Sequence, residues 1–181
     1  MAAQGHERID EAFRASATAE ARDAYSRSQK QSSRASQADD EGRRALKAET
    51  EFQNGEALMA KRDYEAALLC LARAMEVFPG EGEYRAHYGW CLYLCHPDNE
   101  VMLAEAVEHC REGLKLAKDR EKPYLLLGRL YKAMGKTEVA KKMFMRAVQI
   151  KPRCVEAMRE LRLLNMRREK DKGMLKRLFR R

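Results

Sequence analysis

The side chains best able to bind a metal or act as nucleophiles, cysteine and histidine, are concentrated between residues 91 and 110. In order along the chain they are Cys91, Cys95, His96, His109 and Cys110. This spacing matches no usual zinc-ligand pattern, and none of the five cysteines of the chain forms a C-x-x-C pair. Because free cysteines are often buried and these lie in apolar stretches, we expect them in a hydrophobic core and expect no metal site.

The rest of the sequence lacks the patterns typical of catalysis. No nucleophile is paired with a base, and no glycine-rich phosphate loop or metal-binding motif occurs. We therefore expect no catalytic residues, no cofactor and no small-molecule substrate.

The composition indicates an all-α fold. Apolar residues are Ala, Leu and Met more than Val and Ile, 35% of residues are charged, and only four are proline. No apolar run approaches the roughly 18 residues of a membrane span, and the N-terminus lacks the apolar core of a secretory signal. The 181 residues allow one domain plus appendages, and we expect a cytoplasmic protein.

Small residues recur at a period typical of a helical repeat. Gly55, Gly89 and Gly128 are followed 12, 17 and 12 residues later by Ala67, Ala106 and Ala140. Small residues at such positions allow the two helices of a hairpin to approach closely. Each hairpin leaves an apolar face uncovered, so several hairpins must stack.

This pattern resembles the tetratricopeptide repeat (TPR), a 34-residue hairpin of helices A and B. The matching residues in unit 48–81 are Gly55, Leu58, Ala67, Leu71, Ala74 and Pro79. In unit 121–154 they are Tyr124, Leu127, Gly128, Tyr131, Ala140, Phe144, Ala147 and Pro152. Unit 82–120 matches through Tyr88, Gly89, Leu92 and Ala106, with five extra residues and with Cys110 and Gly113 in place of the usual aromatic and alanine. The resemblance implies an all-α solenoid of three TPR hairpins plus a capping helix at 155–169, in which we expect Val155, Met158, Leu161 and Leu164 to share the covered side.

The five extra residues begin with His96-Pro97-Asp98, the triplet with which J-domain co-chaperones stimulate a chaperone ATPase. Here the triplet falls between helices A and B of the middle repeat. Pro97 ends one helix, and Asp98 and Asn99 are good N-cap residues for the next. We interpret it as a turn within a repeat.

A second resemblance to J-domains lies in the N-terminal helical appendage, 1–27. It is carried by Ile9, Glu11, Ala12, Phe13, Glu20, Arg22 and Tyr25, which match the last two J-domain helices. The alternative is an amphipathic helix of no special ancestry. The polar segment 28–47 is expected to be a linker, either mobile or a marginal helix that runs into the first repeat.

In TPR arrays the concave groove, lined by the A helices, binds partners. The resemblance assigns this groove to Phe52, Glu56, Met59, Trp90, Tyr93, Leu94, Leu125, Arg129 and Lys132. The alternative is that Trp90 and Tyr93 fill the array. Chaperone-binding members hold a C-terminal carboxylate with Lys and Asn, but Phe52 and Glu56 stand at those positions and Leu126 replaces an Arg. We therefore do not expect capture of a chaperone tail.

The C-terminal tail, 170–181, is strongly basic. Its cations include Lys172, Lys176, Arg177, Arg180 and Arg181. They alternate with apolar residues at helical spacing, and Gly173 is expected to separate this tail from the capping helix. Such a segment can bind an acidic partner, a membrane surface or nucleic acid, and a solubilising end is the alternative.

These patterns predict a non-catalytic TPR adaptor or scaffold that binds a peptide or amphipathic helix of a protein partner in its groove. Two alternatives remain. One is a constitutive structural or regulatory subunit of a larger complex, and the other is a degenerate J-domain co-chaperone.

Overall fold

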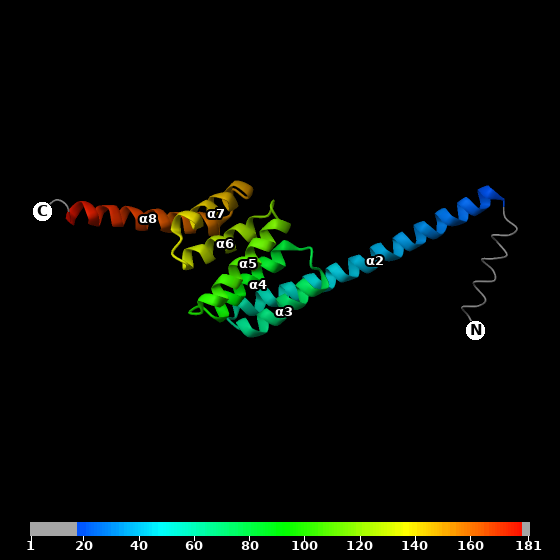
Figure 1. The fold of residues 1–181 in the computed structure, drawn as a ribbon, viewed down its shortest axis with the longest axis horizontal. Coiled ribbons are helices and arrows are strands. Elements are labelled where there is room, and N and C mark those ends of the chain that lie inside the picture. The colour runs from blue at the N-terminus through cyan, green and yellow to red at the C-terminus, as the bar shows by residue number, and fades with distance from the viewer. Residues whose placement is uncertain (1–17, 179–181) are drawn as a thin grey trace. The chain divides into compact units, whose positions relative to one another are not determined.

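The computed structural model describes residues 18–178, with side chains as far as Glu169 except that of Glu20 (Figure 1). Within this range the chain forms seven helices and no strand, which confirms the expected all-α class. They are α2 (Ala19–Ala60), α3 (Tyr64–Val77), α4 (Gly82–Cys95), α5 (Glu100–Leu116), α6 (Glu121–Ala133), α7 (Thr137–Ile150) and α8 (Val155–Leu178). None of the helices in the described range is both long enough and apolar enough to cross a membrane.

Residues 1–44 and 45–181 form two separate compact units. The described part of the first unit is the N-terminal part of α2, whose side chains are almost all exposed. Polar contacts within it join residues three or four positions apart, such as Asp40 and Arg43 at 2.7 Å. Of the two forms expected for 28–47, the structure has the helix that runs into the first repeat. Four of the residues that carry the J-domain resemblance, Ile9, Glu11, Ala12 and Phe13, lie outside the described residues.

The second unit is an array of helical hairpins. Residues 45–60 of α2 pair with α3, since a Cβ at Gly55 would lie 2.8 Å from the side chain of Leu71. Helix α4 pairs with α5, and α6 pairs with α7, while α8 packs against α7. The A helices are therefore α2, α4 and α6, and α8 occupies the capping position. The expected TPR solenoid is confirmed.

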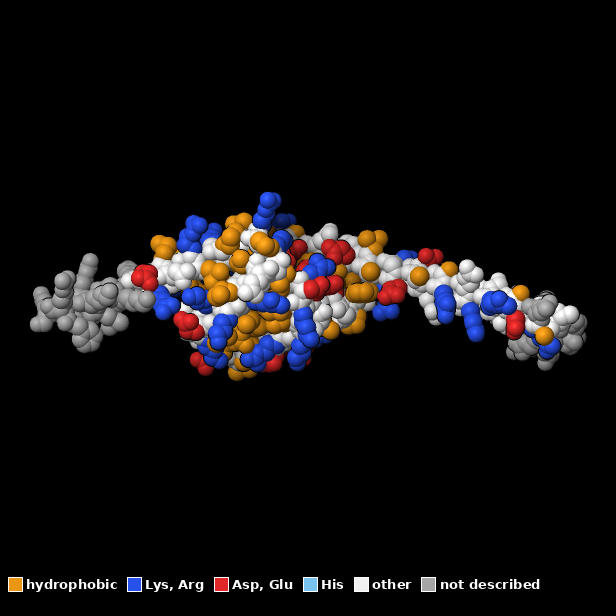
Figure 2. All heavy atoms as spheres, turned by 90° about the horizontal axis from the view of Figure 1, so that it is seen from above, with side chains coloured by type: hydrophobic (Ala, Val, Ile, Leu, Met, Phe, Trp, Pro, Cys, Tyr) orange, Lys and Arg blue, Asp and Glu red, His pale blue; other side chains and the backbone are white. Residues whose placement is uncertain are grey.

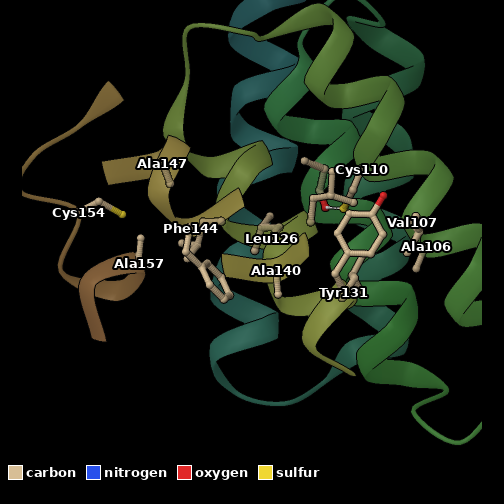
Figure 3. Packing of buried hydrophobic residues seen from close by; sticks show 14 of the residues in the cluster. Ala106, Val107, Cys110, Leu126, Tyr131, Ala140, Phe144, Ala147, Cys154 and Ala157 are labelled. Atoms are coloured by element: carbon tan, nitrogen blue, oxygen red, sulfur yellow. Dashed lines mark hydrogen bonds between the residues drawn. The ribbon is translucent and has the colours of Figure 1, made fainter. Parts of the chain in front are cut away.

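Apolar side chains gather in two clusters along this array. One joins α2, α3 and α4 around Phe52, Leu71 and Tyr84. The other extends from α4 to α8, and Figure 3 shows Phe144 and Ala147 of α7 near Ala157 of α8. On the face of the array seen in Figure 2, apolar side chains also remain visible between Lys, Arg, Asp and Glu side chains.

Gly89 allows α4 and α5 to approach closely. A Cβ atom at this position would lie 2.6 Å from the backbone oxygen of Ala106. Two helices of one hairpin can therefore touch at their backbones here, as the spacing of small residues predicted.

The connection between α4 and α5 contains the His96-Pro97-Asp98 triplet. His96 ends α4, and its backbone N–H donates to the carbonyl oxygens of Leu92 and Tyr93. The side chain of Asn99 accepts hydrogen bonds from the N–H groups at 101 and 102, so it is the N-cap of α5. The triplet is exposed and forms a turn, which confirms its interpretation.

The covered side of α8 differs from the expected one. Ala157 and Leu164 are buried and Leu161 is half-buried, whereas Val155 is 69% exposed and Met158 is 41% exposed. The expected face was therefore wrong for Val155 and Met158. Helix α8 also continues through Gly173 to Leu178, so this glycine does not separate the tail from the capping helix.

Candidate partner-binding groove

An aromatic pair and a cation meet on neighbouring A helices. Trp90 and Tyr93 of α4 are half-buried, with ring centroids 5.4 Å apart and ring planes tilted by 38°. They are three residues apart, so they lie side by side on one face of the helix. The guanidinium carbon of Arg129, on α6, lies 5.6 Å from the centroid of the Trp90 ring. This distance is within the range of a cation–π contact.

These side chains surround a pocket of about 430 Å³. Its lining residues are Trp90, Tyr93, Arg129, Lys132, Ala133, Glu160 and Arg167. The two A helices α4 and α6 and the capping helix α8 therefore all contribute to one surface depression.

Two carboxylates of α8 bind three cations of α6. Glu156 lies 3.0 Å from Nζ of Lys122 and 3.0 Å from Nη2 of Arg129. Glu160 lies 2.5 Å from Nζ of Lys132 and 3.9 Å from Nε of Arg129. Burial raises the pKa of Glu156, but the hydrogen bond from Lys122 and the charges of Lys122 and Arg129 outweigh burial, and the net effect is a lowered pKa. The ion pairs hold α8 against α6 and fix the direction of the Arg129 side chain.

The opposite end of the array has a different polar contact. Nε2 of His87, which is buried, lies 3.3 Å from a carboxylate oxygen of Glu56 on α2. Nδ1 of the same ring lies 2.8 Å from the backbone oxygen of Glu83. The hydrogen bond from His87 lowers the pKa of Glu56, against the raising effect of burial.

The structure brings four of the nine predicted groove residues together at the pocket: Trp90, Tyr93, Arg129 and Lys132. Glu56 is exposed on α2, while Met59 and Leu94 are half-buried and do not line the pocket. Phe52 and Leu125 offer no surface to a partner, because they are 6% and 0% exposed. Phe52 is buried by the rings of Tyr84 and His87, at centroid distances of 4.7 Å and 4.9 Å. Their assignment to the groove surface is corrected accordingly.

Sequence reasoning missed the contribution of α8, namely Glu156, Glu160 and Arg167. A signal for Glu156 was present, because it follows Lys122 by 34 residues, one TPR period, and therefore holds the same place in its helix. The predicted tail residues Lys172, Lys176 and Arg177 belong to α8, but their side chains lie outside the described residues. Arg180 and Arg181 lie outside the described residues entirely.

The cysteines lie mainly in the interior. Cys91, Cys110 and Cys154 are buried, and Cys70 and Cys95 are half-buried. The thiol of Cys110 donates to the backbone oxygen of Ala86 at 3.2 Å. Among the described residues, no three His, Cys, Asp or Glu side chains are placed to hold a metal ion together.

Comparisons with known proteins agree with the array of helical hairpins. The model of the tetratricopeptide repeat family matches residues 122–154. No match was found among curated proteins. The first TPR of Spaghetti (RPAP3), solved with the HSP90 peptide SRMEEVD, is 24% identical, with a TM-score of 0.56 over 67% of this chain and 93% of that chain.

Two further solved structures are similar. The first TPR domain of human RPAP3 is 21% identical, with a TM-score of 0.60 over 71% of this chain and 98% of that chain. The Sgt2 TPR domain from Aspergillus fumigatus is 16% identical, with a TM-score of 0.58 over 70% of this chain and 82% of that chain. The chain thus has the fold of tetratricopeptide-repeat domains and carries the sequence pattern of that repeat at residues 122–154.

Proposed function

We propose that this protein is a non-catalytic cytoplasmic adaptor that binds a peptide or helix of a protein partner in the groove formed by its A helices. The observation that carries the proposal is the half-buried Trp90–Tyr93 pair beside Arg129 at the mouth of a pocket. Trp, Tyr and Arg are the residue types most often found as anchors of protein interfaces. They lie on the neighbouring helices α4 and α6 and are only half-buried, so each keeps surface that a partner can contact.

The solved TPR domains support groove binding as the mode. The first TPR of Spaghetti (RPAP3) was solved bound to an HSP90 peptide, and the second TPR domain of human RPAP3 in complex with an HSP70 peptide. The residues of this chain argue against the same ligand. The positions at which chaperone-binding members carry Lys, Asn and Arg are occupied here by buried Phe52, acidic Glu56 and buried Leu126. We therefore propose a different protein ligand in a related groove.

A constitutive subunit of a larger complex is the second candidate function. The observation that favours it is the exposed apolar surface of α8, formed by Val155, Met158 and Met166. A neighbouring subunit would bury such a surface permanently. The basic tail could add an acidic partner, a membrane surface or nucleic acid to either candidate.

Affinity capture from native extract tests the proposal. The baits are the full chain, the double variant Trp90→Ala/Tyr93→Ala, a chain ending at Lys172, and the control Leu69→Ala/Leu116→Ala. The control removes exposed apolar side chains of the B helices α3 and α5 instead of groove residues. We expect a partner that is lost with the groove variant and retained with the control. Equal recovery with all four baits would refute the groove, and loss only with the shortened chain would assign binding to the tail.

A further inference from the structure

The pocket beside Trp90 carries an excess of positive charge. Its charged lining residues are Arg129, Lys132 and Arg167 against Glu160, which gives three minus one, or +2. Lysine and arginine keep their charge throughout the physiological pH range. This pocket therefore offers a partner a positively charged surface that lies next to the Trp90–Tyr93 pair.

The cations keep hydrogen-bond donors for a partner. The guanidinium of Arg129 has five N–H donors, and only the bond from Nη2 to Glu156 is a close one. The ammonium of Lys132 has three donors, and one of them binds Glu160. The carboxylate of Glu160 lies deeper than either cation, since its side chain is 15% exposed against 23% for Arg129 and 33% for Lys132. The remaining donors of both cations are therefore the more accessible groups.

Arg167 completes this cationic surface. It lines the pocket, is exposed, and makes no ion pair with any residue whose side chain the structure describes. Glu160 and Arg167 are seven residues apart on α8, two helical turns, and both face the pocket. Leu163 lies between them at i+3 from Glu160 and i+4 before Arg167, on the same side of the helix, and it is exposed. Helix α4 thus contributes aromatic side chains and α6 contributes cations, while α8 contributes a cation and an exposed leucine.

We infer that the groove selects a partner segment in which an acidic side chain lies close to an aromatic or aliphatic one. The apolar side chain packs against Trp90 and Tyr93, and the carboxylate accepts hydrogen bonds from Arg129, Lys132 and Arg167. Charge-assisted hydrogen bonds of this kind are about twice as strong as neutral ones. The inference rests on the proposed function, because it names the chemistry of the segment that the groove binds.

A selection from a displayed library of random 12-residue peptides tests this inference on the full chain. The wild type is compared with Arg167→Glu and with Arg162→Glu. Both substitutions change the net charge equally, but Arg162 is exposed and does not line the pocket. Arg167→Glu removes no ion pair among the side chains that the structure describes, and Arg167 is exposed, so the substitution is expected to leave the fold intact.

We expect the wild type and Arg162→Glu to enrich peptides with Asp or Glu within one helical turn of an aromatic or aliphatic residue. The best selected peptide is expected to bind Arg167→Glu about tenfold more weakly, since reversal of a charge at the binding surface replaces attraction by repulsion. Binding to the wild type should also weaken as salt is added.

Two results separate failure of this inference from failure of the proposed function. Enriched peptides that are neutral or basic, yet lost with Trp90→Ala/Tyr93→Ala, would overturn the acidic preference and leave groove binding in place. No enrichment, or enrichment that persists in the Trp90→Ala/Tyr93→Ala variant, would overturn both. Equal binding to the two charge variants would also overturn the role of the pocket cations.

Discussion

The guanidinium carbon of Arg129 lies 5.6 Å from the centroid of Trp90, so a cation of α6 covers the only tryptophan of the chain. The same guanidinium donates to Glu156 of α8. The side chain of Arg129 therefore connects its own helix, α6, to both α4 and α8. Because the indole ring reports its surroundings by fluorescence, this contact gives the groove an intrinsic probe.

Arg129→Ala is expected to destabilise the array by about 1 kcal/mol, the usual size of one cation–π contact and one partly exposed ion pair. Glu156 and Glu160 keep Lys122 and Lys132 as partners, so the loss stays small. Urea unfolding followed by Trp90 fluorescence measures the free energy of unfolding. The control Arg73→Ala removes an exposed arginine of α3 and should change stability by less than about 0.5 kcal/mol. Equal losses in both variants would show that the Trp90 contact contributes nothing.

Gly89→Ala is expected to cost about 2 kcal/mol or more, because the new Cβ would lie 2.6 Å from the backbone oxygen of Ala106. A neighbouring helix backbone cannot move aside as the end of a flexible side chain can. Thermal unfolding followed by circular dichroism measures the loss. Gly42→Ala is the matched control, since nothing lies within 4 Å of its Cβ position in α2. It should stabilise the helical state of α2 locally by up to about 1 kcal/mol, the difference in helix propensity between Gly and Ala. It should not lower the unfolding midpoint of the array.

The hairpins could be predicted from the sequence because small residues at fixed spacing dictate where helices touch. Gly113 illustrates the limit of pattern matching. It replaces the alanine of the repeat pattern, and yet it lies opposite Gly82, where a Cβ at 113 would come within 2.5 Å of the oxygen of residue 82. The departure from the pattern is thus a second small-residue contact, and only the helix crossing reveals it.

The covered face of α8 could have been predicted better from helix geometry. Val155 and Leu164 are nine residues apart, about two and a half helical turns, so they lie on opposite sides. The regular spacing of three residues between Val155, Met158, Leu161 and Leu164 therefore winds around the helix instead of forming one stripe. The burial of Phe52 was not predictable in this way, because it depends on Tyr84 and His87 of a different helix.

Alkylation should distinguish two classes of cysteine. Burial raises the pKa of Cys91 to about 12, and burial also raises the pKa of Cys110. The reactive species is the thiolate, so both thiols should resist iodoacetamide in the native protein. Cys70 and Cys95 are only half-buried and should react first, at rates that increase with pH. Mass spectrometry before and after denaturation in urea locates the labels, and labelling of native Cys110 as fast as Cys70 would contradict its buried position.

The ion pairs of α8 should make stability depend on pH in a defined direction. The pKa of Glu156 in the folded protein is lowered from the ordinary value of 4.5, because Lys122 and Arg129 outweigh the raising effect of burial. A lowered folded pKa means that the carboxylate stabilises the array above the unfolded pKa. This stabilisation is lost as the pH falls through the folded pKa.

Glu156→Gln is therefore expected to flatten the fall in unfolding free energy below pH 4.5. At neutral pH its cost should not exceed about 1 kcal/mol, since the side chain is partly exposed and water weakens the pair. Urea unfolding between pH 3 and pH 7 (roughly the range in which carboxylates and their partners titrate) gives the comparison. Glu138→Gln, which changes an exposed carboxylate in the first turn of α7, serves as the matched control and should follow the wild-type profile. If Glu156→Gln also follows that profile, the contacts with Lys122 and Arg129 do not stabilise α8, and its position depends on the Glu160–Lys132 pair and on Ala157, Leu161 and Leu164.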